Sequence, residues 1–392
     1  MTQPTKSKVP KIRFKGFAGV WVEKMLGDEP GEIIAGGDVD KSKLRQHGSY
    51  PVLANALQNH GILGYYEREF RVKAPAVTVT GRGDVGHAVA REVNFTPVVR
   101  LLSVKGQHNV YFLKESINNH PVLVESTGVP QLTIPQLSGY RIFFPHTTRE
   151  ESQIGVYFRE VDRLIGLQQG KHEKLVTLKK AMLHAMFPKP GETTPEIRFK
   201  GFSGDWVKTK VDEICGETYG GGTPKTSERI FWEGVIPWIQ SSDITDGDLY
   251  KVQPRKYISD LALRKSPTKL VPGNSIAIVT RVGVGKLALI EFSYATSQDF
   301  LSLSNLKLDQ AFAVVALSIL LQSKLHETQG TSIKGITKEE LLAYSLSIPL
   351  TIAEQQKIGR YFRTLDELIS QHALQLRKLK QLKAAFLEKM FV

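Results

Sequence analysis

The sequence has a single cysteine, Cys215, among 392 residues. One thiol excludes a disulfide framework and a cysteine-rich zinc site, because both need several cysteines. A single cysteine fits a reducing compartment, where its simplest role is packing. We therefore expect Cys215 to behave as a small buried apolar residue.

Long hydrophobic runs are also absent. The longest run, Ala311 to Leu321, has eleven residues and is broken by Ser318, whereas a membrane-spanning helix needs about 20. Residues 1–14 lack the apolar core of a secretory signal peptide. The sequence therefore predicts a cytoplasmic protein with no membrane partner.

Motifs of catalysis are missing as well. There is no His-Glu-x-x-His, no Gly-x-Ser-x-Gly, no Asn/Asp-Pro-Pro-Tyr/Phe and no metal-binding spacing among the ten histidines. Residues 81–86 fit the dinucleotide pattern Gly-x-Gly-x-x-Gly, but no acidic residue follows about 20 positions later. Residues 283–286 resemble a P-loop, but its first glycine is missing and Leu287 replaces the Ser or Thr. We expect no enzymatic activity, no metal site and no cofactor bound by this chain.

Acidic residues are fewer than basic residues. The chain has 52 Lys and Arg against 39 Asp and Glu, a net charge of +13, and half of the basic residues lie within 1–196. Because both halves carry the excess, it is not a basic tail. Such a charge favours a polyanionic partner, with nucleic acid first among them, and solubility alone is the alternative.

The chain contains an internal repeat. Residues 12–21 read IRFKGFAGVW and residues 197–206 read IRFKGFSGDW, with eight of ten positions identical. Residues 50–53, 82–87 and 140–145 match residues 236–239, 281–286 and 344–349 in the same order. The ends of the repeats are alike and the middles differ, as expected of one scaffold with two recognition surfaces.

Each repeat predicts a globular α+β part followed by a long helix. Short strand-like runs, such as 76–80 and 275–280, alternate with Gly and Pro turns. The expected boundaries are globular parts at 1–149 and 189–350, and helices at 150–188 and 351–392.

The two helical segments carry apolar residues at alternating steps of three and four, the pattern of a coiled coil. Two such helices in one chain predict an antiparallel intramolecular pair, with homodimerisation as the alternative. Lys383 interrupts the pattern, Leu382 is expected to replace it, and Lys179 is assigned to the charged outer face. The residues predicted to pack the helices, or a partner on them, are Phe158, Ile165, Leu175, Phe362, Ile369 and Leu379.

The remaining candidates are polar loop residues suited to nucleic acid. Arg and Lys suit phosphate and guanine, Asn and Gln suit adenine, and Ser and Thr serve either. Taken singly, each is equally well explained as a solvated loop residue, but Arg82 and Arg281 occupy the same glycine-rich turn in both repeats. The predicted DNA-binding residues are Gln58, Asn59, His60, Arg82, His87, Thr223, Lys225, Ser241, Ser242, Arg281, Lys286 and Lys334.

Several segments of the second repeat resemble the specificity (S) subunits of type I restriction–modification systems. The first repeat departs more, because it lacks Gly-Gly-Thr-Pro. The segments that carry the resemblance are Gly-Gly-Thr-Pro-Lys at 221–225, Ile-Pro-Trp-Ile at 236–239, Ser-Asp-Ile at 242–244, Arg-Val-Gly-Val-Gly-Lys at 281–286, Gly-Ile-Thr at 335–337 and Glu-Gln-Gln-Lys-Ile at 354–358.

This resemblance implies that each globular part is a target recognition domain for one half of a bipartite, asymmetric DNA site. It implies that the helices set the spacer and dock two methyltransferase subunits, which hold S-adenosylmethionine. Restriction or translocase subunits, which use ATP and Mg, are further partners that the resemblance allows. The alternative is a stand-alone DNA-binding or coiled-coil scaffold protein without a methyltransferase partner.

Overall fold

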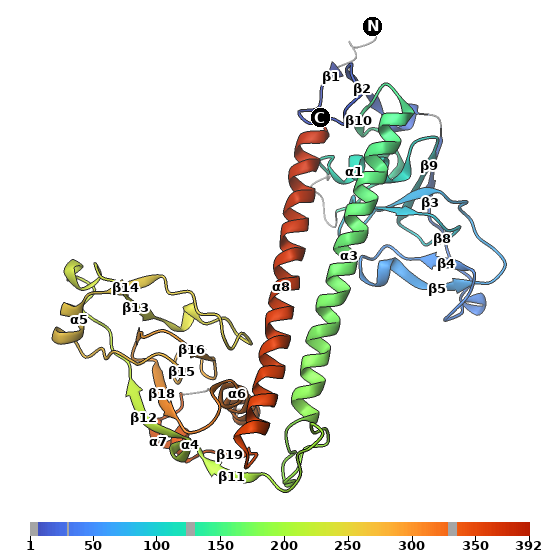
Figure 1. Ribbon diagram of the computed structural model, residues 1–392. Coiled ribbons are helices and arrows are strands. Elements are labelled where there is room, and N and C mark those ends of the chain that lie inside the picture. The colour runs from blue at the N-terminus through green and yellow to red at the C-terminus, as the bar shows by residue number, and fades with distance from the viewer. Residues whose placement is uncertain (1–6, 30, 123–129, 328–334) are drawn as a thin grey trace. The chain divides into compact units, whose positions relative to one another are not determined.

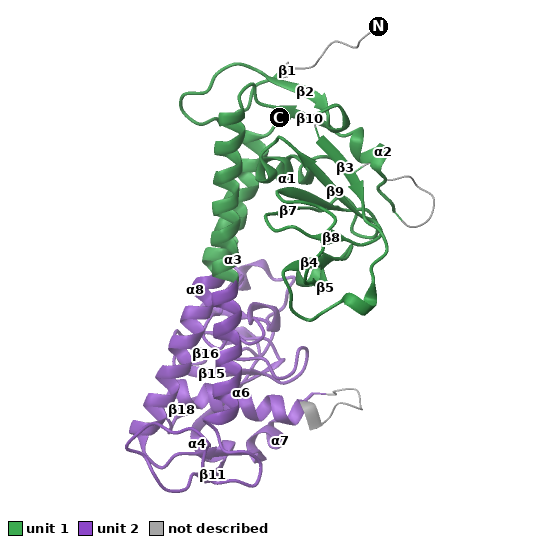
Figure 2. Cartoon of the chain, turned by 90° about the vertical axis from the view of Figure 1, so that its right-hand side faces the viewer, with its two compact units in different colours: residues 1–169, 374–392 green, residues 170–373 purple. Residues whose placement is uncertain are grey.

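A computed structural model describes residues 7–29, 31–122, 130–327 and 335–392. The chain divides into two compact units, shown in different colours in Figure 2. Unit 1 comprises residues 1–169 and 374–392, and unit 2 comprises residues 170–373. Each unit therefore combines the globular part of one repeat with segments of both long helices.

In the part of unit 1 that the structure describes, the strands form three small sheets. In the largest, antiparallel strands follow the order β3-β9-β6-β7, and a second sheet has the order β5-β4-β8, with β4 and β8 parallel. The third sheet is β1-β2-β10. The elements are β1 (Ser7–Lys8), β2 (Trp21–Met25), η1 (Leu26–Asp28), β3 (Gly31–Ala35), η2 (Lys41–Lys43), β4 (Tyr50–Leu53), η3 (Gln58–Gly61), β5 (Ile62–Tyr66), β6 (Ala76–Thr80), β7 (Ala88–Arg91), β8 (Thr96–Pro97), β9 (Leu101–Gly106), α1 (Val110–Asn118), α2 (Ile134–Ser138) and β10 (Arg141–Phe144).

Unit 2 repeats this topology. Its strand orders β12-β18-β15-β16 and β14-β13-β17 match the two larger sheets of unit 1, strand for strand. The predicted duplication is therefore present in the fold as well as in the sequence. The elements are β11 (Val207–Lys210), α4 (Val211–Ile214), β12 (Cys215–Gly220), η4 (Arg229–Phe231), β13 (Ile236–Ile239), η5 (Ser241–Asp243), β14 (Lys256–Ile258), α5 (Asp260–Lys265), β15 (Ser275–Val279), β16 (Leu287–Ile290), β17 (Ala295–Thr296), β18 (Phe300–Leu306), α6 (Gln310–Glu327), α7 (Lys338–Ala343) and β19 (Ser345–Ile348).

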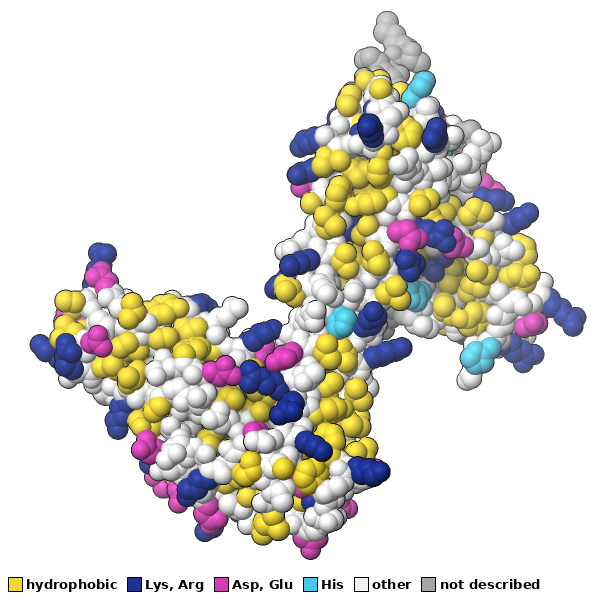
Figure 3. All heavy atoms as spheres, viewed as in Figure 1, with side chains coloured by type: hydrophobic (Ala, Val, Ile, Leu, Met, Phe, Trp, Pro, Cys, Tyr) yellow, Lys and Arg dark blue, Asp and Glu magenta, His cyan; other side chains and the backbone are white. Residues whose placement is uncertain are grey.

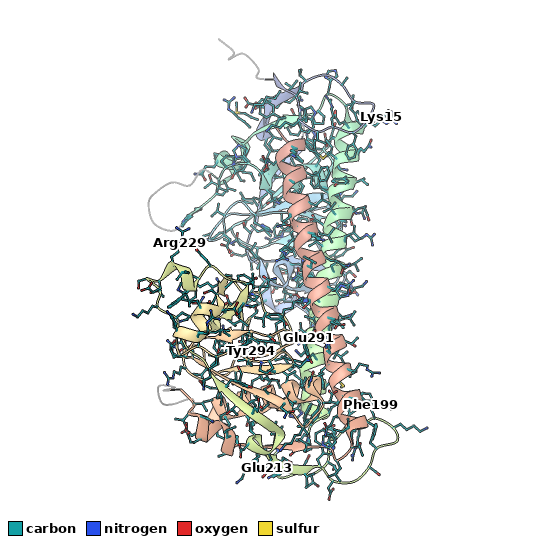
Figure 4. All side chains as sticks on the ribbon, turned by 60° about the vertical axis from the view of Figure 1, so that its left-hand side comes forward. Lys15, Phe199, Glu213, Arg229, Glu291 and Tyr294 are labelled. Atoms are coloured by element: carbon teal, nitrogen blue, oxygen red, sulfur yellow. The ribbon has the colours of Figure 1, made fainter. Side chains whose placement is uncertain are left out.

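The apolar run of the sequence forms the core of unit 2. It lies in α6, where residues 312–317 are all buried and the helix contacts β16 and β19. No helix among the described residues is long and apolar enough to cross a membrane. Cys215 is buried in the same core, as predicted, and burial raises the pKa of its thiol. Figure 4 shows Tyr294 in the interior of the unit, where its hydroxyl bonds Ser302 Oγ at 3.1 Å.

The two predicted long helices are continuous. They are α3 (Thr148–Ala185) and α8 (Ile352–Met390), drawn in green and red in Figure 1. In unit 1, the rings of Phe158 and Phe391 lie 5.7 Å apart. In unit 2, the rings of Phe187 and Phe362 lie 6.0 Å apart. In each unit, the beginning of one helix therefore packs against the end of the other, so the pairing is antiparallel, as predicted.

The helix-packing residues lie on the shielded sides of the helices. Phe158 and Phe362 are fully buried, because each lies where its helix joins the core of a unit. Along the helices between the two cores, the packing residues are only partly buried. Four of the predicted packing residues are half-buried, namely Ile165, Leu175, Ile369 and Leu379.

The positions of two lysines, Lys383 and Lys179, differ from the prediction. Leu382 is exposed, and Lys383 instead points at α3, where its Nζ bonds Asp162 Oδ1 at 2.7 Å. Lys179 is not on the outer face either, because it forms an ion pair with Asp366 of α8 in unit 2. Each lysine sits in the seam because a carboxylate of the facing helix neutralises it, a pairing that apolar periodicity cannot reveal.

The two ion pairs have different surroundings. Asp162 is bound by both Lys114 and Lys383, and these bonds lower its pKa in spite of burial. Among the described residues, Asp366 is paired with Lys179, and burial raises the pKa of Asp366. The pKa values of these two equivalent carboxylates are therefore shifted in opposite directions.

The repeated IRFKGF segments anchor the starts of the long helices. Arg13 binds Glu150 through Nε and Nη2, at 2.6 Å each, and Arg198 binds Glu354 at 2.7 and 2.8 Å. Both carboxylates are almost fully buried in the first turn of their helix. A bidentate pair of this kind is geometrically specific. It holds the beginning of each repeat against the first turn of that repeat's long helix, which explains why this segment is so similar in the two repeats.

His108 makes unit 1 sensitive to pH. Its two ring nitrogens each lie 2.9 Å from a carboxylate, Nδ1 from Glu151 and Nε2 from Glu29. Burial lowers the pKa of His108, but the two carboxylates outweigh it, and the net result is a pKa above the ordinary value of 6.5. The protonated ring thus stabilises unit 1 fully below the ordinary histidine pKa, and this stabilisation is lost as the pH rises through the raised pKa.

We expect the stability of unit 1 to fall as the pH rises through the raised pKa of His108, since the folded state must then lose a proton it binds tightly. Hydrogen exchange of the α1 amides between pH 6 and 9, corrected for the intrinsic exchange rate, measures this fall. The variant His108→Asn should lose this pH dependence. An equal pH dependence in the parent and the variant would contradict the assignment.

Candidate nucleic-acid interface

A tight turn joins two antiparallel strands at the same place in each unit. In unit 1 the turn connects β6 to β7, and Thr80 N donates to His87 O at 3.0 Å. In unit 2 it connects β15 to β16, and Val279 N donates to Lys286 O at 2.8 Å. Gly83 and Gly283 have φ of +75° and +85°, a region that favours glycine. The predicted hairpin turn is therefore confirmed, and neither turn starts a phosphate-binding helix.

The predicted loop residues of unit 1 lie on the surface close to this turn. Gln58, Asn59 and His60 form η3 and are exposed. Just before η3, Asn55 bonds the turn twice, since its Nδ2 donates to Arg82 O and its Oδ1 accepts from Gly81 N, both at 2.7 Å. The structure therefore brings η3 and the Arg82 turn together.

Arg91 links β6 to η3 through two hydrogen bonds. Its Nε donates to Thr78 Oγ1 and its Nη2 donates to His60 O, both at 3.0 Å, and burial lowers the pKa of Arg91 to about 10. Partial loss of solvation, with the charges of Lys114 and Arg91, lowers the pKa of His87. His87 is therefore neutral at pH 7 and can accept or donate a hydrogen bond there. Neither Asn55 nor Arg91 lies in a motif that the sequence could single out.

In unit 2 the serines and the turn residues come together. An added Cβ at Gly283 would lie 4.0 Å from Ser241 Cβ, and Lys286 Nζ donates to Ile244 O at 3.4 Å. Ser241 and Ser242 form η5, directly before Ile244. The segment that follows β13 thus lies against the Arg281 turn, as the segment that follows β4 does in unit 1.

A basic cavity of about 850 Å³ opens beside the Arg281 turn of unit 2. Its charged lining consists of Lys179, Lys180, Arg281, Lys286 and Asp246. Lys179 is neutralised by Asp366, but the remaining cations outnumber Asp246. Such a lining attracts an anion such as a phosphate group. Lys and Arg side chains are also spread over the face of each unit seen in Figure 3.

The remaining predicted residues lie elsewhere. Thr223 bonds Gln298, and Lys225 is exposed, with its carbonyl oxygen accepting from Trp232 Nε1 at 3.1 Å. These two residues form a second polar group on unit 2. Lys334 lies outside the described residues. Within the part of the chain that the structure describes, no three His, Cys, Asp or Glu side chains are grouped to hold a metal ion.

The model of one protein family covers most of the chain. The type I restriction modification DNA specificity domain matches residues 21–177 and again residues 203–382. The chain belongs to this family. The two matches coincide with the two repeats, and the family is described by DNA specificity and not by catalysis.

Curated type I specificity subunits match parts of the chain. The EcoR124I/EcoR124II specificity subunit of Escherichia coli is 32% identical over 180 residues, 44% of this chain and 43% of that protein. The MjaIX specificity subunit of Methanocaldococcus jannaschii is 27% identical over 199 residues, 48% of this chain and 44% of that protein. The matched regions thus span less than half the length of these relatives.

A solved type I specificity subunit shares the fold. The crystal structure of the S subunit from M. genitalium superimposes with a TM-score of 0.72 and 15% identity, over 98% of this chain and 99% of that one. The predicted α+β fold, with two similar domains and two long helices that pair, is therefore confirmed.

Proposed function

We propose that this chain is the non-catalytic DNA-specificity subunit of a type I restriction–modification complex. The observation that carries the proposal is that two units of one topology place different side chains, Asn55 in one and Ser241 in the other, against a matching turn that carries an arginine in both. Each recognition domain, 1–149 and 189–350, would read one half of an asymmetric bipartite site.

The partners follow from the same proposal. Double-stranded DNA binds the exposed turns and loops, and two methyltransferase subunits that hold S-adenosylmethionine dock on the helical segments 150–188 and 351–392. Restriction or translocase subunits with ATP and Mg are an additional part of such a complex. The site of action is the cytoplasm, where the DNA lies.

The experiment is to co-express the chain with a type I methyltransferase subunit from the same organism and to map methylated bases across the host genome. We expect one asymmetric motif of two fixed parts separated by a nonspecific spacer. A palindromic motif would contradict two different domains. Methylation that does not depend on this chain would instead support the stand-alone scaffold.

We expect Arg82→Ala and Arg281→Ala each to weaken specific DNA binding. Loss of a base contact costs about 1–3 kcal/mol and relaxes one half-site only, whereas loss of a phosphate contact weakens all sequences alike and lowers the salt dependence. Titrations of a target and a scrambled duplex at several salt concentrations separate the two cases.

Matched controls are Arg68→Ala in unit 1 and Arg264→Ala in unit 2, because each removes one charge from an exposed arginine of the same unit. If the turn variants bound both duplexes like the parent, the turns would not lie at the interface.

A further inference from the structure

One exposed arginine of unit 2 is held rigid by a buried carboxylate. Arg255 Nε donates to Asp243 Oδ1 at 2.6 Å, and its Nη2 donates to Ser242 Oγ. The Asp243 side chain is fully buried, whereas the Arg255 side chain is 61% exposed. A surface arginine usually samples many rotamers, and this one is confined to a single orientation by two bonds.

Asp243 is itself fixed. Its second carboxylate oxygen accepts from Gln240 N at 2.9 Å, which closes a capping box around η5. The carboxylate is therefore part of the folded structure of η5, and Arg255 is the surface side chain that it orients. An ion pair with so exposed an arginine adds little stability, so its main consequence is geometric.

One edge of the Arg255 guanidinium makes no hydrogen bond within the described residues, and the side chain is mostly exposed. Nε and one Nη2 hydrogen are used within the protein, and Nη1 has no hydrogen-bond partner among the described residues. Nη1 and the second Nη2 hydrogen form a pair of parallel donors. Two parallel donors match the O6 and N7 acceptors that guanine presents in the major groove.

This arginine adjoins the candidate interface of unit 2. Ser242, which binds Arg255, follows Ser241, and Ser241 lies against Gly283 of the Arg281 turn. Lys286 of the same turn bonds Ile244, which follows Asp243. Arg255, η5 and the basic turn therefore form one continuous polar surface within unit 2.

Unit 1 has a different side chain at the matching place. Val52 pairs with Gly64 in β4 and β5 as Trp238 pairs with Lys256 in β13 and β14, so Gly64 corresponds to Lys256. The residue before each is Leu63 in unit 1, where the register of the β4–β5 ladder shifts, and Arg255 in unit 2. Leu63 is 51% exposed. The two units share the strand pair and differ in the exposed side chain next to it, which is the property expected of a position that sets specificity.

We propose that Arg255 is a specificity-determining residue that reads one guanine in the half-site of unit 2, and that Asp243 is its positioning residue. The proposal rests on the proposed function, since it requires sequence-specific DNA binding. Preorganisation increases its discrimination, because little conformational entropy is lost when a fixed arginine binds.

The test is selection of duplexes from a randomised library by the purified full chain with its co-expressed methyltransferase partner, followed by sequencing. The parent should enrich a bipartite motif. Arg255→Ala should lower the preference for guanine at one position of one half-site, roughly 5- to 150-fold, the range of one bidentate contact. The other half-site should be unchanged.

Two variants and one control sharpen the result. Arg255→Lys keeps the charge without the paired donors and should lose the same preference. Asp243→Asn keeps the size of the positioning residue and should reduce the preference partially at that position only. Arg229→Ala is the control, since Arg229 projects from the surface of the same unit and its side chain is 92% exposed (Figure 4). It should leave the motif unchanged.

An unchanged motif with Arg255→Ala would overturn the proposal, and so would a uniform loss of enrichment at all positions, which indicates a phosphate contact. If the parent enriches no motif, the proposed function itself fails, and that outcome is distinct from a variant that retains the parental motif.

Discussion

Phe391→Ala is expected to lower the free energy of unfolding of unit 1 by about 3–5 kcal/mol, the usual cost of removing a buried aromatic ring. The Phe391 ring lies 5.4 Å from Phe112, 5.7 Å from Phe158 and 6.1 Å from Trp21. It follows directly on α8, so the end of the second repeat closes the core of the first.

The equivalent change in unit 2 is Phe187→Ala. Phe187 follows α3 and packs against Trp206, Phe312 and Phe362 at 5.7 to 6.0 Å. We expect it to destabilise unit 2 by a similar amount. Hydrogen exchange followed by mass spectrometry resolves the two units through peptides of β6 and β9 and of β15 and β18.

Leu382→Ala, also in α8, is the control, because Leu382 is 46% exposed and should cost little. If Phe391→Ala lowered the protection of unit 2 and left unit 1 unaffected, the end of α8 would not complete the core of unit 1.

Lengthening both long helices is expected to change the spacing between the two half-sites and leave the half-sites themselves intact. Four residues inserted between Leu164 and Leu175, and four between Leu368 and Leu379, add about 6 Å, close to one helical turn. At about 3.4 Å per base pair, this is one to two extra base pairs of spacer. Methylation mapping of the variant complex measures the change.

The two insertions must be made together. An insertion in one helix alone shifts half of the seam out of register, so that the Asp162–Lys383 and Lys179–Asp366 pairs cannot both form. We expect this single-helix control to be less stable than the double insertion. A changed half-site with an unchanged spacer would show that the helices read DNA and do not set a distance.

The parts of the fold that follow from local patterns could be predicted from the sequence. The repeat, the β6–β7 and β15–β16 hairpins and the two long helices each depend on periodicity or on glycine in a turn. The seam lysines could not be predicted, because Lys383 and Lys179 are neutralised by carboxylates of the facing helix.

The candidate site was predictable only in part, for the same reason. Arg82 and Arg281 stand out because a turn motif occurs twice. Arg255 has no motif, and its rigid orientation arises from Asp243, twelve residues away in the chain and across a sheet connection. Contacts between residues distant in sequence are properties of the folded state, and a single sequence does not display them.

The end of α8 belongs to unit 1, although α8 is the last element of the second repeat. This arrangement sets the order in which the two units can be completed during synthesis. Unit 2 is one continuous stretch, and it can close once Ala373 has left the ribosome. Unit 1 begins first but lacks Met390 and Phe391 until later. Translation proceeds at about 5–20 residues per second, so the 204 residues of unit 2 delay the completion of unit 1 by on the order of 10–40 s. During that interval the first domain to emerge exposes the aromatic surface around Trp21 and Phe158, which makes the nascent chain a natural client for chaperones.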